Sequence, residues 1–346
     1  MAPLSVGLVG YGFSGSTFHA PVLSAVDTLS LAAVVTSQGD KVTADWPGTR
    51  VYDDIQTLLA DSTIDLVVIT SPNTLHYTHA RAALEADKHV VVEKPFTITS
   101  READELIELA ERQGLVLSVY HNRRWDNDFL TIRKIITSDL LGRVHDYEAH
   151  FDRYRLEVRD RWRERDLPGS GNLYDLGSHL IDQALVLFGS PQTVFADLRK
   201  QRPGAHSVDS FYLLLGYEQC RVVLCAGMLI RAQGPRFQLH GDRGSFVKYG
   251  IDPQEEALRQ GGRPGEPGWG MDGPETYGIL TTEVAGLSME TRIPTEIGNY
   301  QSYYRGISEA ICHGRPSPVK ASEARDTIRV LELAEESQRR GQRTDW

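Results

Sequence analysis

Between residues 4 and 120, short apolar runs alternate with segments of helical periodicity. A strand that is apolar along its whole length is buried on both faces, and helices between such strands supply the cover. The pattern therefore predicts an α/β domain with a doubly wound parallel sheet. The predicted strands are Leu4–Val9, Leu31–Val35, Asp65–Thr70, His89–Val92 and Leu115–Tyr120.

After about residue 122 the pattern changes. Helices are predicted near Phe129–Ile136 and Leu173–Phe188, among strands that follow one another without intervening helices. Consecutive strands of this kind predict a C-terminal α+β domain with a mainly antiparallel, open sheet. We expect domains at residues 1–122 and 123–346, with amphipathic helices at about 299–313 and 320–340 that can pack back on the first domain. The predicted strands are Val144–Phe151, Val194–Leu198, Phe211–Tyr217, Arg221–Ala226 and Phe237–His240.

The charge and cysteine content narrow the classes of partner. The 346 residues carry a formal net charge of −10, which disfavours nucleic acid and anionic membranes. No apolar run is long enough to span a bilayer, and the N-terminal run lacks the basic start of a signal peptide. Three cysteines without C-x-x-C spacing predict neither a disulfide framework nor a metal site. We expect a cytoplasmic protein.

A glycine-rich loop follows the first predicted strand and opens a helical segment. Its sequence, Gly10-Tyr11-Gly12-Phe13-Ser14-Gly15, is G-x-G-x-x-G in the context of a dinucleotide site. Gly10 permits the tight turn, Gly12 the close approach of a pyrophosphate, and Gly15 close helix packing. The phosphates would lie at the helix N-terminus. The alternative is that these glycines only close a βα turn.

The loop after the second predicted strand, Thr36-Ser37-Gln38-Gly39-Asp40-Lys41, bears on the choice of cofactor. A carboxylate directly after this strand would bind the adenosine ribose of NAD and repel the 2′-phosphate of NADP. None stands there, and Ser37 and Lys41 can hold a phosphate, so the loop favours NADP. NAD stays open because Asp40 is near and the loop has no arginine. Alternatively, Ser37 is a turn or helix-cap residue and not a cofactor ligand.

Three residues are candidates for acid/base chemistry. Lys94 follows a buried strand, at the sheet edge where ligands of open parallel sheets bind; the alternative is a surface ion pair with Glu93. Asp175 and His179 lie four residues apart, so on a helix they share a face. Histidine titrates near neutrality and suits proton transfer. A helix-terminal Asp175 and a core His179 are the alternative.

The motifs Glu93-Lys94-Pro95 and Gly171-Asn172-Leu173-Tyr174-Asp175-Leu176-Gly177-Ser178-His179 resemble those of the Gfo/Idh/MocA oxidoreductases, along essentially the whole chain. Within that family, residues 118–129, 174–179 and 247–250 resemble the branch that contains NADP-dependent scyllo-inositol dehydrogenase and several uncharacterised bacterial oxidoreductases. The inositol enzyme carries an arginine after the serine that follows its second strand, where this chain has Gln38.

The resemblance assigns roles to individual residues. It implies that Lys94 reaches both the nicotinamide ribose and the substrate hydroxyl, with Pro95 holding the turn, often through a cis peptide. It makes His179 the general acid/base and Asp175 its orienter or a substrate acceptor. Further expected cofactor contacts are Phe13, Ser14, Ser71, Asn73, His76, Glu93 and the closing element Trp162–Arg163; Asn122 and Arg123 are expected to line the substrate cleft, although Arg123 and Arg124 also fit a solvated face.

The expected function is hydride transfer between NADP(H) or NAD(H) and a secondary hydroxyl or ketone of a polyol or sugar, with an inositol favoured. A cofactor-binding sensor and a redox-neutral, NAD-dependent glycoside elimination are the alternatives. We also expect a homodimer or homotetramer, assembled through the uncovered face of the C-terminal sheet. Phe211, Leu213 and Leu215 are candidates for that face; alternatively they face the sheet's own helices.

Overall fold

The computed structural model describes residues 2–346, which form two compact units. The first unit contains the chain up to Trp125 together with Gln254–Trp269 and Asn299–Arg325. The second unit contains Asp126–Pro253, Gly270–Gly298 and Asp326–Trp346. Each unit therefore combines segments that are far apart in the sequence.

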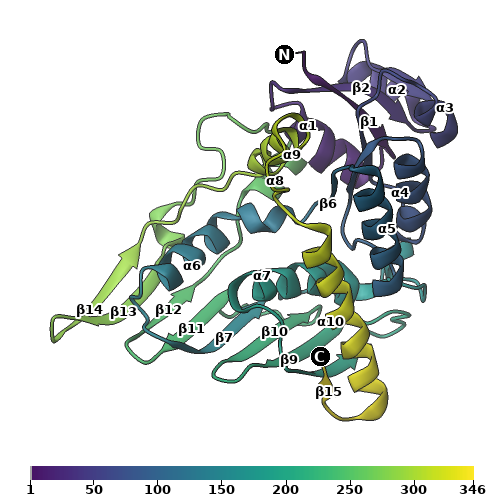
Figure 1. Cartoon of the computed structure of the whole chain (residues 1–346). Coiled ribbons are helices and arrows are strands. Elements are labelled where there is room, and N and C mark those ends of the chain that lie inside the picture. The colour runs from purple at the N-terminus through teal and green to yellow at the C-terminus, as the bar shows by residue number, and fades with distance from the viewer. Residues whose placement is uncertain (1) are drawn as a thin grey trace. The chain divides into compact units, whose positions relative to one another are not determined.

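The first unit is built on a six-stranded parallel sheet with the order β3-β2-β1-β4-β5-β6 (Figure 1). All five predicted strands are present, and the predicted doubly wound sheet is confirmed. The sequence pattern missed β3 because this strand has three residues and is only partly buried at the sheet edge. The strands are β1 (Leu4–Val9), β2 (Leu29–Val35), β3 (Arg50–Tyr52), β4 (Leu66–Ile69), β5 (His89–Val92) and β6 (Leu117–Val119).

The helices of the first unit connect and cover these strands, and α4 and α5 lie side by side (Figure 1). Thr99 and Glu102 form a capping box that starts α5, and Gly114 ends it in the left-handed conformation. The helical elements are η1 (Gly15–His19), α1 (Ala20–Leu23), α2 (Gly39–Asp45), α3 (Ile55–Leu59), η2 (Asn73–Leu75), α4 (His76–Glu85), α5 (Ser100–Gln113), η3 (Asn122–Trp125), α8 (Gln254–Arg259) and α9 (Gln301–His313).

The second unit is built on a nine-stranded sheet with the order β14-β13-β12-β11-β7-β10-β9-β8-β15. Its neighbours are antiparallel except β7 and β10, so the predicted mainly antiparallel sheet is confirmed. The strands are β7 (Val144–His150), β8 (Thr193–Arg199), β9 (Ser210–Gly216), β10 (Arg221–Gly227), β11 (Phe237–Gly241), β12 (Gly244–Lys248), β13 (Gly278–Val284), β14 (Leu287–Ile293) and β15 (Thr344–Asp345).

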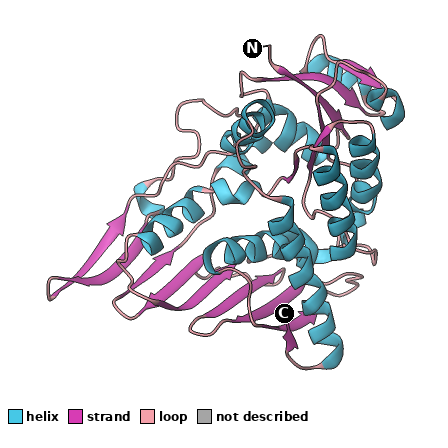
Figure 2. Cartoon of the chain, in the orientation of Figure 1, coloured by secondary structure: helices cyan, strands magenta, loops and turns pink. Residues whose placement is uncertain are grey.

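The helices α6 (Asn127–Thr137) and α7 (Ser178–Phe188) lie over one face of this sheet (Figure 2). The remaining helical elements are η4 (Trp162–Glu164), η5 (Leu173–Gly177), η6 (Pro274–Thr276) and α10 (Ala321–Arg340), which extends from the first unit into the second. Within residues 2–346, no helix is both long and apolar enough to cross a membrane.

The expectation that Phe211, Leu213 and Leu215 lie on an uncovered sheet face is wrong. These side chains are at most 3% exposed, and a Cβ at Gly177 would lie 3.5 Å from the Phe211 ring, so this strand face packs under η5. The three residues face the sheet's own helices, as the alternative had it. Tyr212, which points to the opposite face because side chains alternate along a strand, is 44% exposed.

Candidate cofactor and catalytic sites

The glycine-rich loop lies at the sheet edge where the carboxyl ends of β1, β2, β4 and β5 meet. Gly10 has φ +99°, where a side chain would be strained, and a Cβ at Gly15 would lie 2.2 Å from the Gly10 carbonyl oxygen. A Cβ at Gly12 would meet nothing within 4 Å. The backbone is thus tightly packed at Gly10 and Gly15 and leaves free space at Gly12, as the approach of a cofactor pyrophosphate requires.

Glu93, directly after β5, is fastened to this loop. Its Oε1 accepts a hydrogen bond of 2.7 Å from Ser14 Oγ and lies 3.7 Å from His19 Nε2. The other ring nitrogen of His19, Nδ1, lies 2.6 Å from Tyr304 Oη. Burial alone would raise the pKa of Glu93, but His19, Lys94 and Ser14 together lower that pKa to about 2. Glu93 is therefore an ionised clamp between β5 and the glycine-rich loop.

One oxygen of this clamp fits a bound cofactor. Glu93 Oε2 is buried and has no hydrogen-bond partner within residues 2–346. A buried carboxylate oxygen without a donor costs free energy, so the site has an acceptor for a ligand hydroxyl, such as that of a ribose. The open space at Gly12 and this acceptor together match a dinucleotide.

Lys94 and its neighbours form the next part of the edge. The Lys94–Pro95 peptide is cis, as the resemblance implied, and Lys94 is half-buried. His76 lies between two backbone oxygens, with Nδ1 2.8 Å from the Pro95 carbonyl and Nε2 3.0 Å from the Ser71 carbonyl, and its neutral ring donates to one of them. Burial lowers the pKa of His76. His76 thus joins the loop after β4 to the turn that carries Lys94. Asn73 is buried beside it, at the start of η2.

The expected adenosine end of the site is framed by side chains that the sequence did not single out. Ser37 and Lys41 are exposed, and Lys41 Nζ lies 4.7 Å from the centroid of the Tyr11 ring. Tyr11 Oη donates to Asp45 Oδ2 at 2.8 Å and accepts from Trp46 Nε1 at 2.8 Å. Burial and the Asp45 carboxylate raise the pKa of Tyr11. No local pattern marks Tyr11 or Trp46, because their contacts span more than thirty residues of sequence.

In the second unit, Asp175 and His179 are carried by consecutive helical turns. Asp175 lies in η5, a π-helical turn, and His179 is in the first turn of α7. Single π-helical turns are frequent at functional sites. Arg163 Nη1 lies 3.5 Å from Asp175 Oδ1, and the His179 ring stands edge-on to Phe151 with centroids 6.4 Å apart. The structure therefore brings the predicted element Trp162–Arg163 to the predicted catalytic Asp175.

A buried ionic network fixes the turn that carries Arg163. Arg202 bonds Asp209 at 3.0 Å and Glu164 at 3.1 Å, and all three side chains are at most 9% exposed. Ser207 Oγ also donates to the Arg163 carbonyl at 3.3 Å. Buried, charge-assisted bonds hold their partners in one geometry. Arg163 is thus held in place beside Asp175.

Arg123 and Arg124 are not a solvated face. They are 5% and 7% exposed, and their guanidinium groups pair with Glu255 and Glu323. Asn122 begins η3, the turn that carries them. The first unit therefore uses both arginines to bind segments from the second half of the chain.

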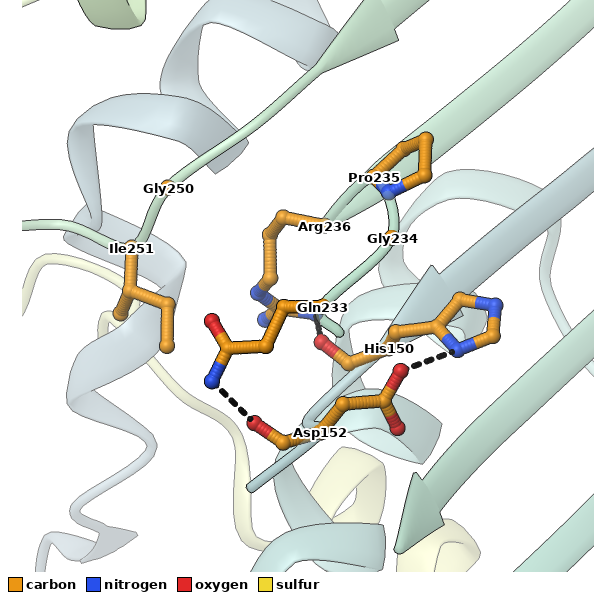
Figure 3. Close-up of a pocket in the computed structure, with 8 residues that line it drawn as sticks. All are labelled: His150, Asp152, Gln233, Gly234, Pro235, Arg236, Gly250 and Ile251. Carbon is orange, nitrogen blue, oxygen red and sulfur yellow. Dashed lines mark hydrogen bonds and ion pairs between the residues drawn. The ribbon is translucent and has the colours of Figure 1, made fainter. Parts of the chain in front are cut away.

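A further hollow lies in the second unit, where β7 ends and β11 begins (Figure 3). Its walls are His150, Asp152, Gln233, Gly234, Pro235, Arg236, Gly250 and Ile251, and neither Asp175 nor His179 lines it. Ligand atoms of Glu148, His150 and Cys225 come within 4.8 Å of one another beside it. The His150 ring nitrogens are bonded to Glu148 and Asp152, which makes this group an ion-pair cluster.

A parallel sheet with a dinucleotide-type glycine loop, joined to an antiparallel α/β unit with an Asp-His pair, defines a two-domain oxidoreductase of the Rossmann type. The chain belongs to the Gfo/Idh/MocA oxidoreductase family. The family's NAD-binding Rossmann fold matches residues 4–121, and its C-terminal alpha/beta domain matches residues 133–345.

Several relatives are close enough to compare along the chain. Scyllo-inositol 2-dehydrogenase (NADP(+)) IolW of Bacillus subtilis is 47% identical, over 96% of this chain and 93% of the relative. A D-glucoside 3-dehydrogenase of Escherichia coli is 31% identical over 55% of each chain. The solved structure of an oxidoreductase from Yersinia pestis is 46% identical, with a TM-score of 0.95 over 100% of this chain and 97% of that one. The protein is thus a sugar or polyol oxidoreductase of this family.

Proposed function

We propose that the protein is an NADP(H)-dependent dehydrogenase that interconverts a secondary hydroxyl and a ketone on a polyol or sugar, with an inositol as the favoured substrate. The observation that carries this proposal is the 47% identity, over 96% of the chain, to a dehydrogenase named for scyllo-inositol and NADP(+). Each unit adds support, because the first contains the glycine-rich loop and Lys94, and the second contains Asp175 and His179.

The nicotinamide ring, when bound, supplies or accepts the hydride. In the first unit, Gly10, Gly12 and Gly15 shape the space for the pyrophosphate, and the Lys94 ammonium stabilises the developing oxyanion. In the second unit, His179 takes the hydroxyl proton and returns it in the reverse direction. Arg163 lies 3.5 Å from Asp175 and orients its carboxylate. That carboxylate either positions His179 or accepts a hydrogen bond from a substrate hydroxyl.

The preference for NADP(H) rests on the end of β2. Ser37 and Lys41 follow the strand and no carboxylate comes directly after it, so a 2′-phosphate meets no immediate repulsion. The relative named for NADP(+) points the same way. Use of NAD is the alternative outcome, in which Asp40 binds the ribose.

The direct test is a substrate screen with both NAD and NADP, covering inositols, aldoses and glucosides, followed by cofactor absorbance. Reduction of NADP by a polyol supports the proposal. Cofactor binding without turnover on any substrate would establish a sensor instead. Cofactor retained through purification, with glycoside cleavage and no net reduction, would establish redox-neutral elimination.

Variants of Lys94 and His179 test the assigned mechanism. Lys94→Ala and His179→Asn should leave the circular dichroism spectrum and NADPH binding largely intact while lowering kcat by about 10²–10⁴-fold, the usual effect of losing one acid/base group. Lys320→Ala and His313→Ala change exposed residues of the same types and should keep full activity. Near-normal kcat in either active-site variant would exclude that residue from the chemical step.

The proposal includes two broader expectations. We expect a homodimer or homotetramer formed through the sheet face that carries Tyr212, which is exposed and lies opposite the helix-covered residues. We also expect the enzyme to act in the cytoplasm, in keeping with its odd number of cysteines and their spacing.

A further inference from the structure

A segment from the second half of the chain lies beside the expected dinucleotide site. Gln254–Trp269 belongs to the first compact unit, and its helix α8 packs against η1, which begins at the last glycine of the glycine-rich loop. The guanidinium of Arg259 lies 5.8 Å from the centroid of the Phe13 ring, in that loop. The tertiary fold therefore adds arginines to a site whose own loops contain none.

The second arginine of this segment is directed at the adenosine end. Arg263 Cζ lies 5.0 Å from the centroid of the Trp46 ring, and Trp46 bonds Tyr11 Oη. Lys41, in α2, lies over the ring of the same Tyr11. The positive charge of Arg263 also acts on Tyr11, where it opposes the rise in the pKa of the phenol. Two cations, one from each half of the sequence, thus approach one aromatic pair.

The charge of Arg263 is not neutralised by a carboxylate of the described residues. Within residues 2–346, Arg263 is exposed and makes no ion pair, whereas Lys41 pairs with Asp45 at 3.4 Å. Arg259 lies 3.8 Å from both Glu255 and Glu256. Arg263 is therefore the cation of this group with a charge available to a ligand.

The loop that carries Arg263 is held at both sides. The Arg263 amide donates to Glu266 Oε2 at 3.0 Å, and the Gly262 amide donates to the Ala257 carbonyl at 2.8 Å. Trp269, 9% exposed, anchors the far end. An anchored loop presents its side chain at a smaller entropic cost on binding.

We propose that Arg263 binds the 2′-phosphate of NADP(H), supplying from the second half of the chain the guanidinium that the loop after β2 lacks at Gln38. A guanidinium offers a planar set of donors that matches a phosphate, and it gains much less from the ribose hydroxyl of NAD(H). Arg263 is then a specificity residue, with Lys41 and Ser37 completing the phosphate pocket. This inference rests on the proposed use of NADP(H).

The test measures binding without turnover. Dissociation constants for NADPH, NADH and 2′,5′-ADP are obtained by fluorescence titration or calorimetry for the wild type, Arg263→Gln, Arg263→Lys and Arg315→Gln. We expect Arg263→Gln to weaken NADPH and 2′,5′-ADP about tenfold or more, which is about 1.4 kcal/mol, and to leave NADH within about twofold. Arg263→Lys should lie between. Arg315→Gln, which removes an exposed charge elsewhere in the same unit, should change nothing.

Three other binding results would each overturn the inference. An equal loss for NADPH and NADH would make Arg263 a support of the loop, and unchanged NADPH binding would leave the phosphate to Lys41 and Ser37. A wild type that binds NADH as tightly as NADPH would remove both this inference and the proposed cofactor. If NADPH preference depends on Arg263 but no polyol is oxidised, the proposed activity fails and the inference stands.

Discussion

The ionised clamp at Glu93 offers a quantitative test of how the glycine-rich loop is held. Glu93→Gln keeps the size of the side chain and its ability to accept the Ser14 hydrogen bond of 2.7 Å, but removes the charge. Glu93 is only 7% exposed, so solvent screens its interactions little. The variant therefore isolates the contribution of the charge to the stability of the first unit.

The magnitude follows from the pKa. The folded state lowers the pKa of Glu93 from 4.5 to about 2, which corresponds to about 3 kcal/mol of unfolding free energy at neutral pH. Because the folded pKa is the lower one, this stabilisation is fully present above pH 4.5 and is lost as the pH falls towards 2. Glu93→Gln should therefore be less stable by up to about 3 kcal/mol at pH 7 and by about 2 kcal/mol at pH 3.5.

The assay is urea unfolding at both pH values, combined with hydrogen exchange of the peptide spanning residues 10–23, which reports on the first unit alone. Glu111→Gln, an exposed position on α5, serves as the control for loss of one carboxylate. Equal stability of Glu93→Gln and wild type at pH 7 would show that the charge contributes nothing. A loss that does not shrink at low pH would assign the effect to packing.

Three further results are expected. Ser37→Asp should shift the ratio of kcat/KM for NADP and NAD towards NAD by about tenfold, because a carboxylate after β2 repels the 2′-phosphate; an unchanged ratio would contradict our placement of the pocket. Burial alone would lower the pKa of His150, but its bonds to Asp152 and Glu148 outweigh burial, and the pKa is raised. Because the folded-state pKa is the higher one, the stability from these bonds is present below pH 6.5 and is lost as the pH rises through the folded-state pKa. His150→Gln should therefore remove a fall in Tm between pH 6 and pH 9, and an identical fall in both proteins would refute this reasoning. Light scattering at micromolar concentration should give the mass of a dimer or tetramer, and a monomer would exclude assembly through the exposed sheet face.

The features predicted correctly are local in the sequence. Five buried strands and the G-x-G-x-x-G turn were visible because hydrophobic periodicity and glycine conformations depend on neighbouring residues. β3, β14 and β15 were not predicted because short or exposed strands have no continuous apolar run. β12 and β13 were not predicted because buried positions alternate with less buried ones in them, so they have no continuous apolar run either. Asp175 and His179 lie on consecutive helical turns, and their joint action at one site stays a prediction.

The sequence by itself determined the two kinds of sheet, the family and the positions of Lys94, Asp175 and His179. Only the tertiary structure decided that Glu93 clamps Ser14, that Arg163 faces Asp175, and that Phe211 points into the core. It also placed Arg263 beside Trp46, more than two hundred residues away in sequence. Such contacts depend on how distant segments of the chain pack. The charge or polarity of a residue does not by itself specify its partner, because any of several oppositely charged or aromatic side chains could make the contact.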